Sequence, residues 1–209
     1  MSLLRTGVLA LALGIAAPAM AAGPAQSDPA AQQIQSFYAT LLDNMKRGPE
    51  LGIQGRYHAL EPVVDATFDL PTMMQIIVGP SWSSLSDQDK HALTAAFRRM
   101  TIASYASNFA KFGGERFDVD PTVQHRANDE IVQSTLIPVG DKPVPFVYRM
   151  RQSAGSWKVI DIFLEGYVSE LAMRRSDFGA TLTSGGAAAL TAKMNQIADN
   201  LLAGAKPTQ

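Results

Sequence analysis

The chain has no cysteine among its 209 residues and only three histidines. Without cysteine it has no disulfide bond, no thiol nucleophile and no cysteine-ligated metal site, so packing alone must stabilise the fold. His58, His91 and His125 fall in different predicted elements and lack the spacing of a metal site, which favours surface or capping roles. We therefore predict no bound metal and no cofactor.

Charge and motif content restrict the function further. The formal net charge is only −1, with 18 Lys and Arg against 19 Asp and Glu, so nucleic acid is not an expected partner. The sequence contains no G-x-S-x-G nucleophile elbow, no P-loop and no G-x-G-x-x-G dinucleotide motif. These absences favour a protein without catalytic residues.

An apolar run follows a single positive charge at the amino terminus. Arg5 precedes the apolar residues 7–17, and Ala19-Met20-Ala21 has the small-x-small pattern that signal peptidase recognises. A membrane anchor is the alternative, but this run is too short to cross a hydrocarbon core of about 30 Å. We expect a cleaved signal peptide over residues 1–21, export to the periplasm, and a single domain over residues 22–209.

Apolar residues at helical spacing, separated by helix-breaking pairs, predict helices at both ends of the chain. Pro29 is typical of a first helical residue, and Gly48-Pro49 ends that helix. Ser86 begins the longest helix with capping-box geometry, and Phe112 is expected to end its inward-facing stripe. The predicted helices cover residues 29–47, 54–64, 70–78, 86–112, 168–178 and 186–202.

The middle of the chain changes to strands separated by short turns. In the third of these strands Phe146 and Tyr148 lie on one face, and Arg149 and Arg151 lie on the other. Connections this short indicate an antiparallel meander with one face covered by helices. The predicted strands cover residues 117–126, 130–139, 144–152 and 156–164. The expected fold class is therefore α+β, with a four-stranded antiparallel sheet covered by N-terminal and C-terminal helices.

Several collinear segments resemble one protein family. Phe68, Gly79 and Trp82 match the family's "F…lG…W" segment. Four further elements, "v-Y-r", "g-W-k-v-y-D-v", "E-G-v-S" and "R-s-x-F", match residues 147–149, 155–162, 165–169 and 175–178. The family that these elements resemble is the MlaC family, also called toluene-tolerance proteins. Tyr167 looks like an insertion in the "E-G-v-S" element, and this departure, together with residues 169–172, resembles the family's hopanoid-associated branch, HpnM.

The resemblance implies a periplasmic carrier with a twisted sheet around an apolar pocket. Its cargo would be phospholipid or a hopanoid-type lipid, shuttled between membranes with an inner-membrane MCE/ABC transporter complex and transient membrane-associated proteins. Transferring a two-chain lipid of about 30 methylenes into water costs roughly 24 kcal/mol, so the carrier must enclose its cargo.

The resemblance places the pocket between the sheet and the helices over residues 70–78 and 93–112. We expect its lining to be Met73, Ile77, Phe97, Met100, Tyr105, Phe146, Tyr148, Ile162, Leu164 and Val168. Each of these residues could instead be ordinary core. A solid-cored scaffold that only docks to a transporter is the alternative function.

Three polar residues remain as candidates for other roles. Asp161, in a largely apolar strand, could be the general base of a cone-like α+β hydrolase or isomerase. A structural partnership with Arg149 or with a loop backbone is the favoured interpretation. Arg174 and Arg175 could meet a lipid phosphate or an acidic partner, and ordinary solvation is the alternative.

Overall fold

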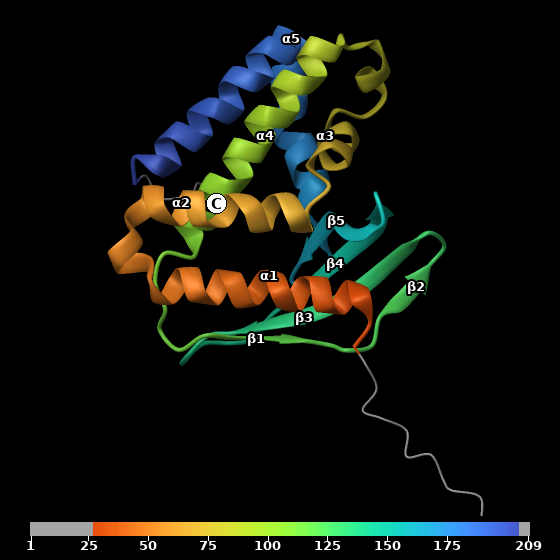
Figure 1. Ribbon diagram of the computed structural model, residues 1–209. Helices are drawn as coiled ribbons and strands as arrows, with labels where there is room; N and C mark the ends of the chain where they lie inside the picture. The colour runs from red at the N-terminus through yellow and green to blue at the C-terminus, as the bar shows by residue number, and fades with distance from the viewer. Residues whose placement is uncertain (1–26, 205–209) are drawn as a thin grey trace, which may run out of the picture.

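Helices cover one antiparallel sheet in the part of the chain that the computed structural model describes, residues 27–204 (Figure 1). The expected signal peptide, residues 1–21, lies outside these described residues. The helices are α1 (Pro29–Lys46), α2 (Gly48–Thr67), α3 (Leu70–Val78), the 3-10 helix η1 (Gly79–Ser84), α4 (Asp87–Asn108) and α5 (Glu170–Leu202).

The sheet is antiparallel throughout, which confirms the α+β class. Its strand order is β1-β3-β4-β5-β6, and β2 pairs with the other half of β3. The strands are β1 (Arg116–Val119), β2 (Gln124–Arg126), β3 (Asp129–Ile137), β4 (Val144–Ser153), β5 (Ser156–Leu164) and β6 (Val168–Ser169).

One strand prediction and one helix prediction need correction, and together they give the sheet six strands where four were predicted. The single strand expected over residues 117–126 is two strands, because Pro121 lacks the N–H that a continuous ladder would use and Asp120 begins a turn by accepting from the Thr122 N–H at 2.8 Å. The expected helix over residues 168–178 begins two residues late. Val168 pairs with Leu164 as β6, and the helix starts at Glu170.

The helix boundaries follow the capping residues. Asp28 accepts a hydrogen bond from the Ala30 N–H at 2.8 Å, Asp69 accepts from the Thr72 N–H at 3.1 Å, and Ser86 accepts from the Asp89 N–H at 3.1 Å. Side-chain oxygens of this kind satisfy N–H groups that the first turn of a helix leaves free.

The observed helices also differ from the predicted ones in the length of α2 and in the end of α4. Helix α2 is longer than expected and bends at Gly52, where φ is 60°. The two helices expected near the carboxyl terminus are both present within α5, where they meet at Gly186, whose φ of 66° and ψ of −164° are not helical. Helix α4 ends at Asn108, so Phe112 lies outside it, exposed rather than inward, with the Lys46 ammonium 5.2 Å from its ring centroid.

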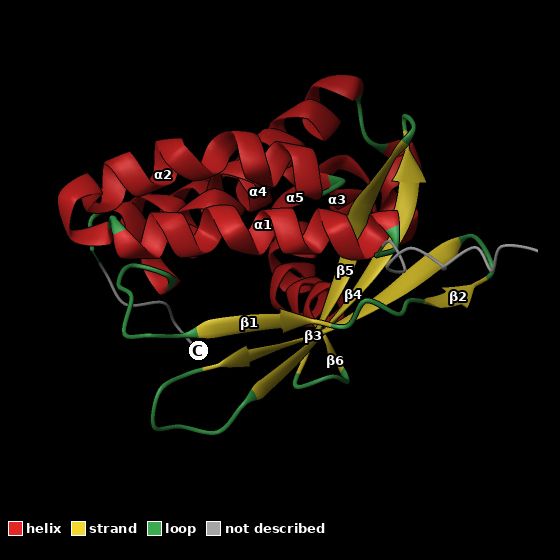
Figure 2. Ribbon diagram, turned by 60° about the horizontal axis from the view of Figure 1, so that its bottom comes forward, coloured by secondary structure: helices red, strands yellow, loops and turns green. Residues whose placement is uncertain are grey.

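The part of the core next to the sheet lies between the sheet and helices α1, α3 and α4, and α2 and α5 also contribute completely buried residues. Figure 2 shows α1 crossing the sheet, and α2 runs back along α1 (Figure 1). Phe37 of α1 is completely buried, as are Val132 of β3 and Met150 of β4 on the covered face of the sheet. Because alternate strand residues share a face, burying these positions also directs their neighbours Tyr148 and Ile162 toward the helices.

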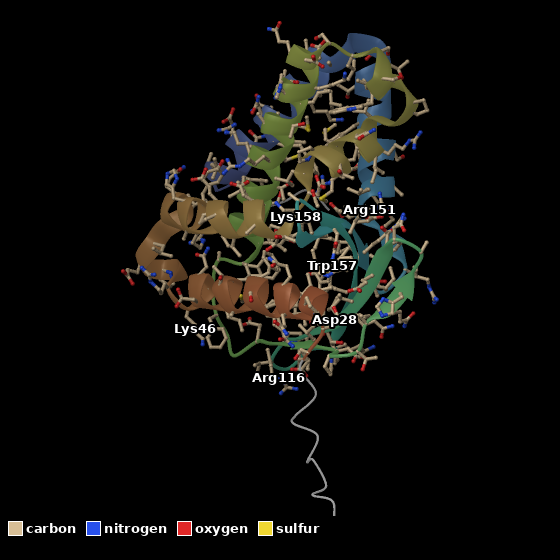
Figure 3. The ribbon with its side chains drawn as sticks, turned by 45° about the vertical axis from the view of Figure 1, so that its right-hand side comes forward. Asp28, Lys46, Arg116, Arg151, Trp157 and Lys158 are labelled. Carbon is tan, nitrogen blue, oxygen red and sulfur yellow. The ribbon has the colours of Figure 1, made fainter. Side chains whose placement is uncertain are left out.

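A buried ion cluster fixes the start of β3 to β4. The carboxylate of Asp129, only 4% exposed, accepts hydrogen bonds from Arg149 Nε and Arg151 Nε, both at 2.6 Å. Burial opposes ionisation of Asp129, but the hydrogen bonds from Arg151 and Arg149 outweigh it and lower its pKa. In Figure 3, Arg151 and Asp28 lie at the same end of the molecule, and Lys46 lies at the far end of α1.

Glu130, next to this cluster, is a buried carboxyl group with an incomplete set of partners. Its Oε1 lies 3.2 Å from Nδ1 of His125, but its buried Oε2 has no hydrogen-bond donor among the described residues. Burial raises the pKa of Glu130, and the nearby Asp28 carboxyl group raises it further, while His125 opposes the shift. Ionised Glu130 therefore lowers the stability of the fold.

Replacing Glu130 by glutamine is expected to stabilise the protein by about 1 kcal/mol at pH 7, because a neutral amide can donate to the Asp28 carboxylate. A raised folded-state pKa costs stability above that pKa, and the cost disappears as the pH falls below the unfolded value of about 4.3. Urea unfolding should therefore show a higher midpoint for Glu130→Gln at pH 7 and a shrinking difference toward pH 4. The exposed Glu50→Gln should show neither effect, and an unchanged midpoint for Glu130→Gln at pH 7 would contradict this account.

Candidate functional site

A cavity of about 300 Å³ lies between the inner face of the sheet and the helices. Its walls come from α1, α3, α4, β1, β4, β5 and the first turns of α5, together with Phe68 and Phe109. Helix α4 contributes most, because Phe97, Met100, Thr101, Ser104, Tyr105 and Asn108 recur on one helical face.

Eight of the ten residues expected to line a pocket do face this cavity. They are Met73, Phe97, Met100, Tyr105, Phe146, Tyr148, Ile162 and Leu164. Ile77 does not line it, because it lies one turn beyond Met73 on α3, where it is buried in the core. Val168 does not line it either, because it continues the sheet as β6 instead of turning inward on a helix.

The cavity has a buried base and a partly exposed mouth. Tyr38, Phe68 and Met100 at the base are each at most 4% exposed. At the mouth, Asn108 is exposed, and the side chains of Glu170 and Arg174 are 21% and 29% exposed. Arg174, which also lines the cavity, was predicted only as a possible contact of a lipid phosphate or an acidic partner. The sequence analysis did not predict the other lining residues, Tyr38, Leu41, Phe68, Thr101, Ser104, Asn108, Phe109, Phe117 and Glu170.

Aromatic rings form much of the wall nearest α1. Tyr38 stacks on Phe117 with ring centroids 4.1 Å apart, and Phe109 lies 5.8 Å from Tyr105 and 6.1 Å from Phe117. Rings at these spacings pack favourably while each still presents an edge or face to a neighbouring ligand. The arrangement therefore gives the cavity a continuous apolar surface from its base toward its mouth.

One polar network crosses the base. The Tyr38 hydroxyl lies 2.8 Å from Ser134 Oγ and 2.8 Å from the Tyr148 hydroxyl. Burial raises the pKa of Tyr38 to about 12, against the opposing effect of these hydrogen bonds, and burial also raises the pKa of Tyr148. Both phenols are therefore uncharged at neutral pH, and they satisfy one another without placing a charge in the cavity.

Asp161 has a structural role. One carboxylate oxygen accepts from the backbone N–H groups of Ile162, at 2.8 Å, and Leu171, at 3.3 Å, and the other accepts from Ser169 Oγ at 2.7 Å. The favoured structural interpretation from the sequence therefore stands, but the partners are Ser169 and backbone N–H groups of β5 and α5, because Arg149 pairs with Asp129 instead. Asp161 fastens the end of β5 to the start of α5 and is not part of the cavity wall.

The two adjacent arginines of α5 have different surroundings. Arg174 lines the cavity, and its Nε donates to Glu170 Oε1 at 2.8 Å. Arg175 is exposed and does not line the cavity. Its guanidinium lies against Gly79, where a Cβ atom would come within 2.7 Å of it.

The described residues offer little to any other chemistry. Among residues 27–204, no group of three or more His, Asp or Glu side chains is placed to hold a metal ion. None of the helices in this part of the chain is long and apolar enough to cross a membrane. The site is thus an apolar cavity with one charged pair at its mouth.

These features define an α+β protein with a ligand-sized cavity enclosed between an antiparallel sheet and its covering helices. The family model described as "MlaC protein" matches residues 35–196, and the chain therefore belongs to the MlaC family. A solved structure of a phospholipid-binding protein from Ralstonia solanacearum, in complex with a phospholipid, has a TM-score of 0.72 and 22% sequence identity. The match covers 83% of this chain and 99% of that chain, and it shows that the two proteins share a fold.

Proposed function

We propose that this protein is a periplasmic lipid carrier that encloses the acyl chains of a phospholipid in the cavity and catalyses no reaction. The observation that carries the proposal is the cavity itself, with its buried aromatic and aliphatic base and its partly exposed polar mouth. Membership of the MlaC family and the shared fold with a phospholipid-binding protein support it. The partner we propose for loading or unloading is an inner-membrane MCE/ABC transporter complex.

The cavity volume sets a condition on this function. At about 300 Å³ it lies at the lower end of the roughly 300–1,000 Å³ that ligand pockets occupy. Exposing about 30 methylenes to water would cost roughly 24 kcal/mol, so partial insertion of two acyl chains would leave most of that cost in place. We therefore propose that the sheet and α4 separate on loading, and Met73 and Met100 in the wall have the flexible side chains that such repacking needs.

The eight expected residues that face the cavity are the proposed acyl-chain contacts. The apolar walls fit a polycyclic hopanoid as well as acyl chains, so a hopanoid-type lipid is the alternative cargo. A solid-cored scaffold is not supported by an interior that contains a cavity of about 300 Å³. Catalysis by Asp161 is not supported either, because its carboxylate is hydrogen-bonded to Ile162, Leu171 and Ser169.

The experiment is lipid extraction and native mass spectrometry of the protein purified from a periplasm, followed by transfer assays between donor and acceptor vesicles. We expect one lipid per chain and a transfer rate proportional to protein concentration. A protein that carries no lipid after gentle purification, and that transfers none between vesicles, would contradict the carrier function.

A further inference from the structure

One ion pair stands at the mouth of the cavity. Among the described residues that line the cavity, Glu170 and Arg174 are the only ones with charged side chains, and their side chains meet at 2.8 Å. Both side chains are more than two-thirds buried. Two helical turns near the carboxyl end of α4 bring the polar side chains of Thr101, Ser104 and Asn108 to the same cavity.

The ion pair occupies only part of the hydrogen-bonding capacity of the two side chains. Arg174 donates to Glu170 through Nε, and a guanidinium has four further N–H donors on its two terminal nitrogens. Glu170 accepts at Oε1, and within residues 27–204 its Oε2 has no assigned hydrogen bond. The negative field of Glu170 reaches into the cavity, since after burial and Tyr38 it is the next cause that raises the pKa of Tyr105. Both charges therefore have free hydrogen-bonding capacity beside the mouth.

The geometry points to a headgroup site for a lipid that carries both a phosphate and a primary ammonium group, the class of phosphatidylethanolamine. This inference rests on the proposed carrier function and adds its cargo class. With the acyl chains in the apolar base, the headgroup would come to the mouth, where Arg174 can donate to the phosphate and Glu170 can accept from the ammonium. The two opposite charges of the site then match the two opposite charges of the ligand.

An anionic headgroup without an amine fits this site less well. The phosphate of phosphatidylglycerol could still bind Arg174, but it would weaken the Arg174–Glu170 attraction and leave Glu170 beside a second negative charge. The partly buried position reduces screening by water and salt, so the difference should exceed that of a fully exposed pair. The site is thus expected to discriminate by the amine.

The test offers the purified protein vesicles of equal parts phosphatidylethanolamine and phosphatidylglycerol with matched acyl chains, and measures the protein-bound lipids by mass spectrometry. We expect phosphatidylethanolamine to be enriched about threefold or more over the vesicle composition, a preference within reach of one partly exposed ion pair. Glu170→Gln should return the ratio to that of the vesicle without lowering total lipid. Arg174→Gln should lower the amount of both lipids, because both carry the phosphate.

A matched control separates recognition from helix stabilisation. Asp43 and Arg47 form an exposed pair at the same i,i+4 spacing at the carboxyl end of α1, 3.7 Å apart and outside the cavity wall, so Asp43→Asn should leave the lipid ratio unchanged. A wild-type ratio equal to that of the vesicle, or enrichment that persists in Glu170→Gln, would overturn the headgroup assignment while the carrier function stands. Failure to bind either lipid would overturn the phospholipid carrier function, and the headgroup assignment with it.

Discussion

Leu164→Glu is expected to reduce bound lipid about tenfold or more while the chain remains folded. Leu164 ends β5 opposite Phe146, and both half-buried side chains line the cavity. A carboxylate there would lie against the first methylenes of the acyl chains without a hydrogen-bond partner, which costs about 1–3 kcal/mol. Each 1.4 kcal/mol corresponds to a factor of ten in affinity. Lipid per chain after purification, measured by mass spectrometry, gives the result directly.

The control for this change is Leu182→Glu. Leu182 is also a half-buried leucine packed against the core, but it lies on α5 outside the cavity wall. The two variants should lose similar stability in thermal denaturation, because each exchanges a half-buried leucine for a charged side chain. Only Leu164→Glu should lose its lipid. Equal lipid content in both folded variants would show that the acyl chains do not pass Leu164.

Asp161→Ala is expected to destabilise the fold by about 3 kcal/mol, the largest stability effect of any single change proposed for this chain. The carboxylate is 8% exposed and accepts three hydrogen bonds, of which those from Ser169 and Leu171 join β5 to the start of α5. Its removal leaves the buried N–H of Leu171 without a partner and frees Ser169, which itself caps α5. Urea unfolding followed by circular dichroism measures the loss.

Two further variants test the interpretation of Asp161. Asp118→Ala removes an exposed carboxylate whose partner is Arg116, so it should cost less than about 1 kcal/mol. Asp161→Asn keeps one acceptor oxygen and should cost less than the alanine change, with lipid transfer retained. A general base would instead lose all activity in Asp161→Asn. A small stability loss in Asp161→Ala, no larger than in Asp118→Ala, would disprove the structural role.

The sequence predicted most of the elements that face the cavity, but it did not predict where the mouth of the cavity lies. Phe146 and Tyr148 alternate in a strand, and Met100 and Tyr105 recur in a helix, so period alone predicts which side they occupy. Period cannot distinguish a cavity wall from solid core. Tyr38 shows this, because it belongs to a regular apolar stripe on α1 and yet meets Tyr148 across the cavity base.

The remaining misses depend on contacts between residues far apart in the chain. Ile77 and Met73 have the same spacing signal on α3, and only the position of that helix over the sheet decides that Met73 reaches the cavity. The sequence indicated Arg174 as a possible contact for a lipid phosphate or an acidic partner, but nothing in it indicated that Glu170 joins Arg174 at the cavity. Their place at the mouth follows from the two-residue strand β6, which sets where α5 begins.

The interruption at Pro121 also divides the strand at one edge of the sheet into two short strands. One edge consists of β1 and β2, four and three residues long. On the opposite edge β6 pairs only with Phe163 and Leu164 of β5, and Phe68 forms a single bridge with Val159. A neighbouring chain that added a strand beside β1 and β2 would find no long, continuous row of free backbone donors and acceptors, because the edge is interrupted at Pro121. For a chain without cysteine, whose folded state depends on packing alone, an interrupted edge of this kind limits edge-to-edge aggregation.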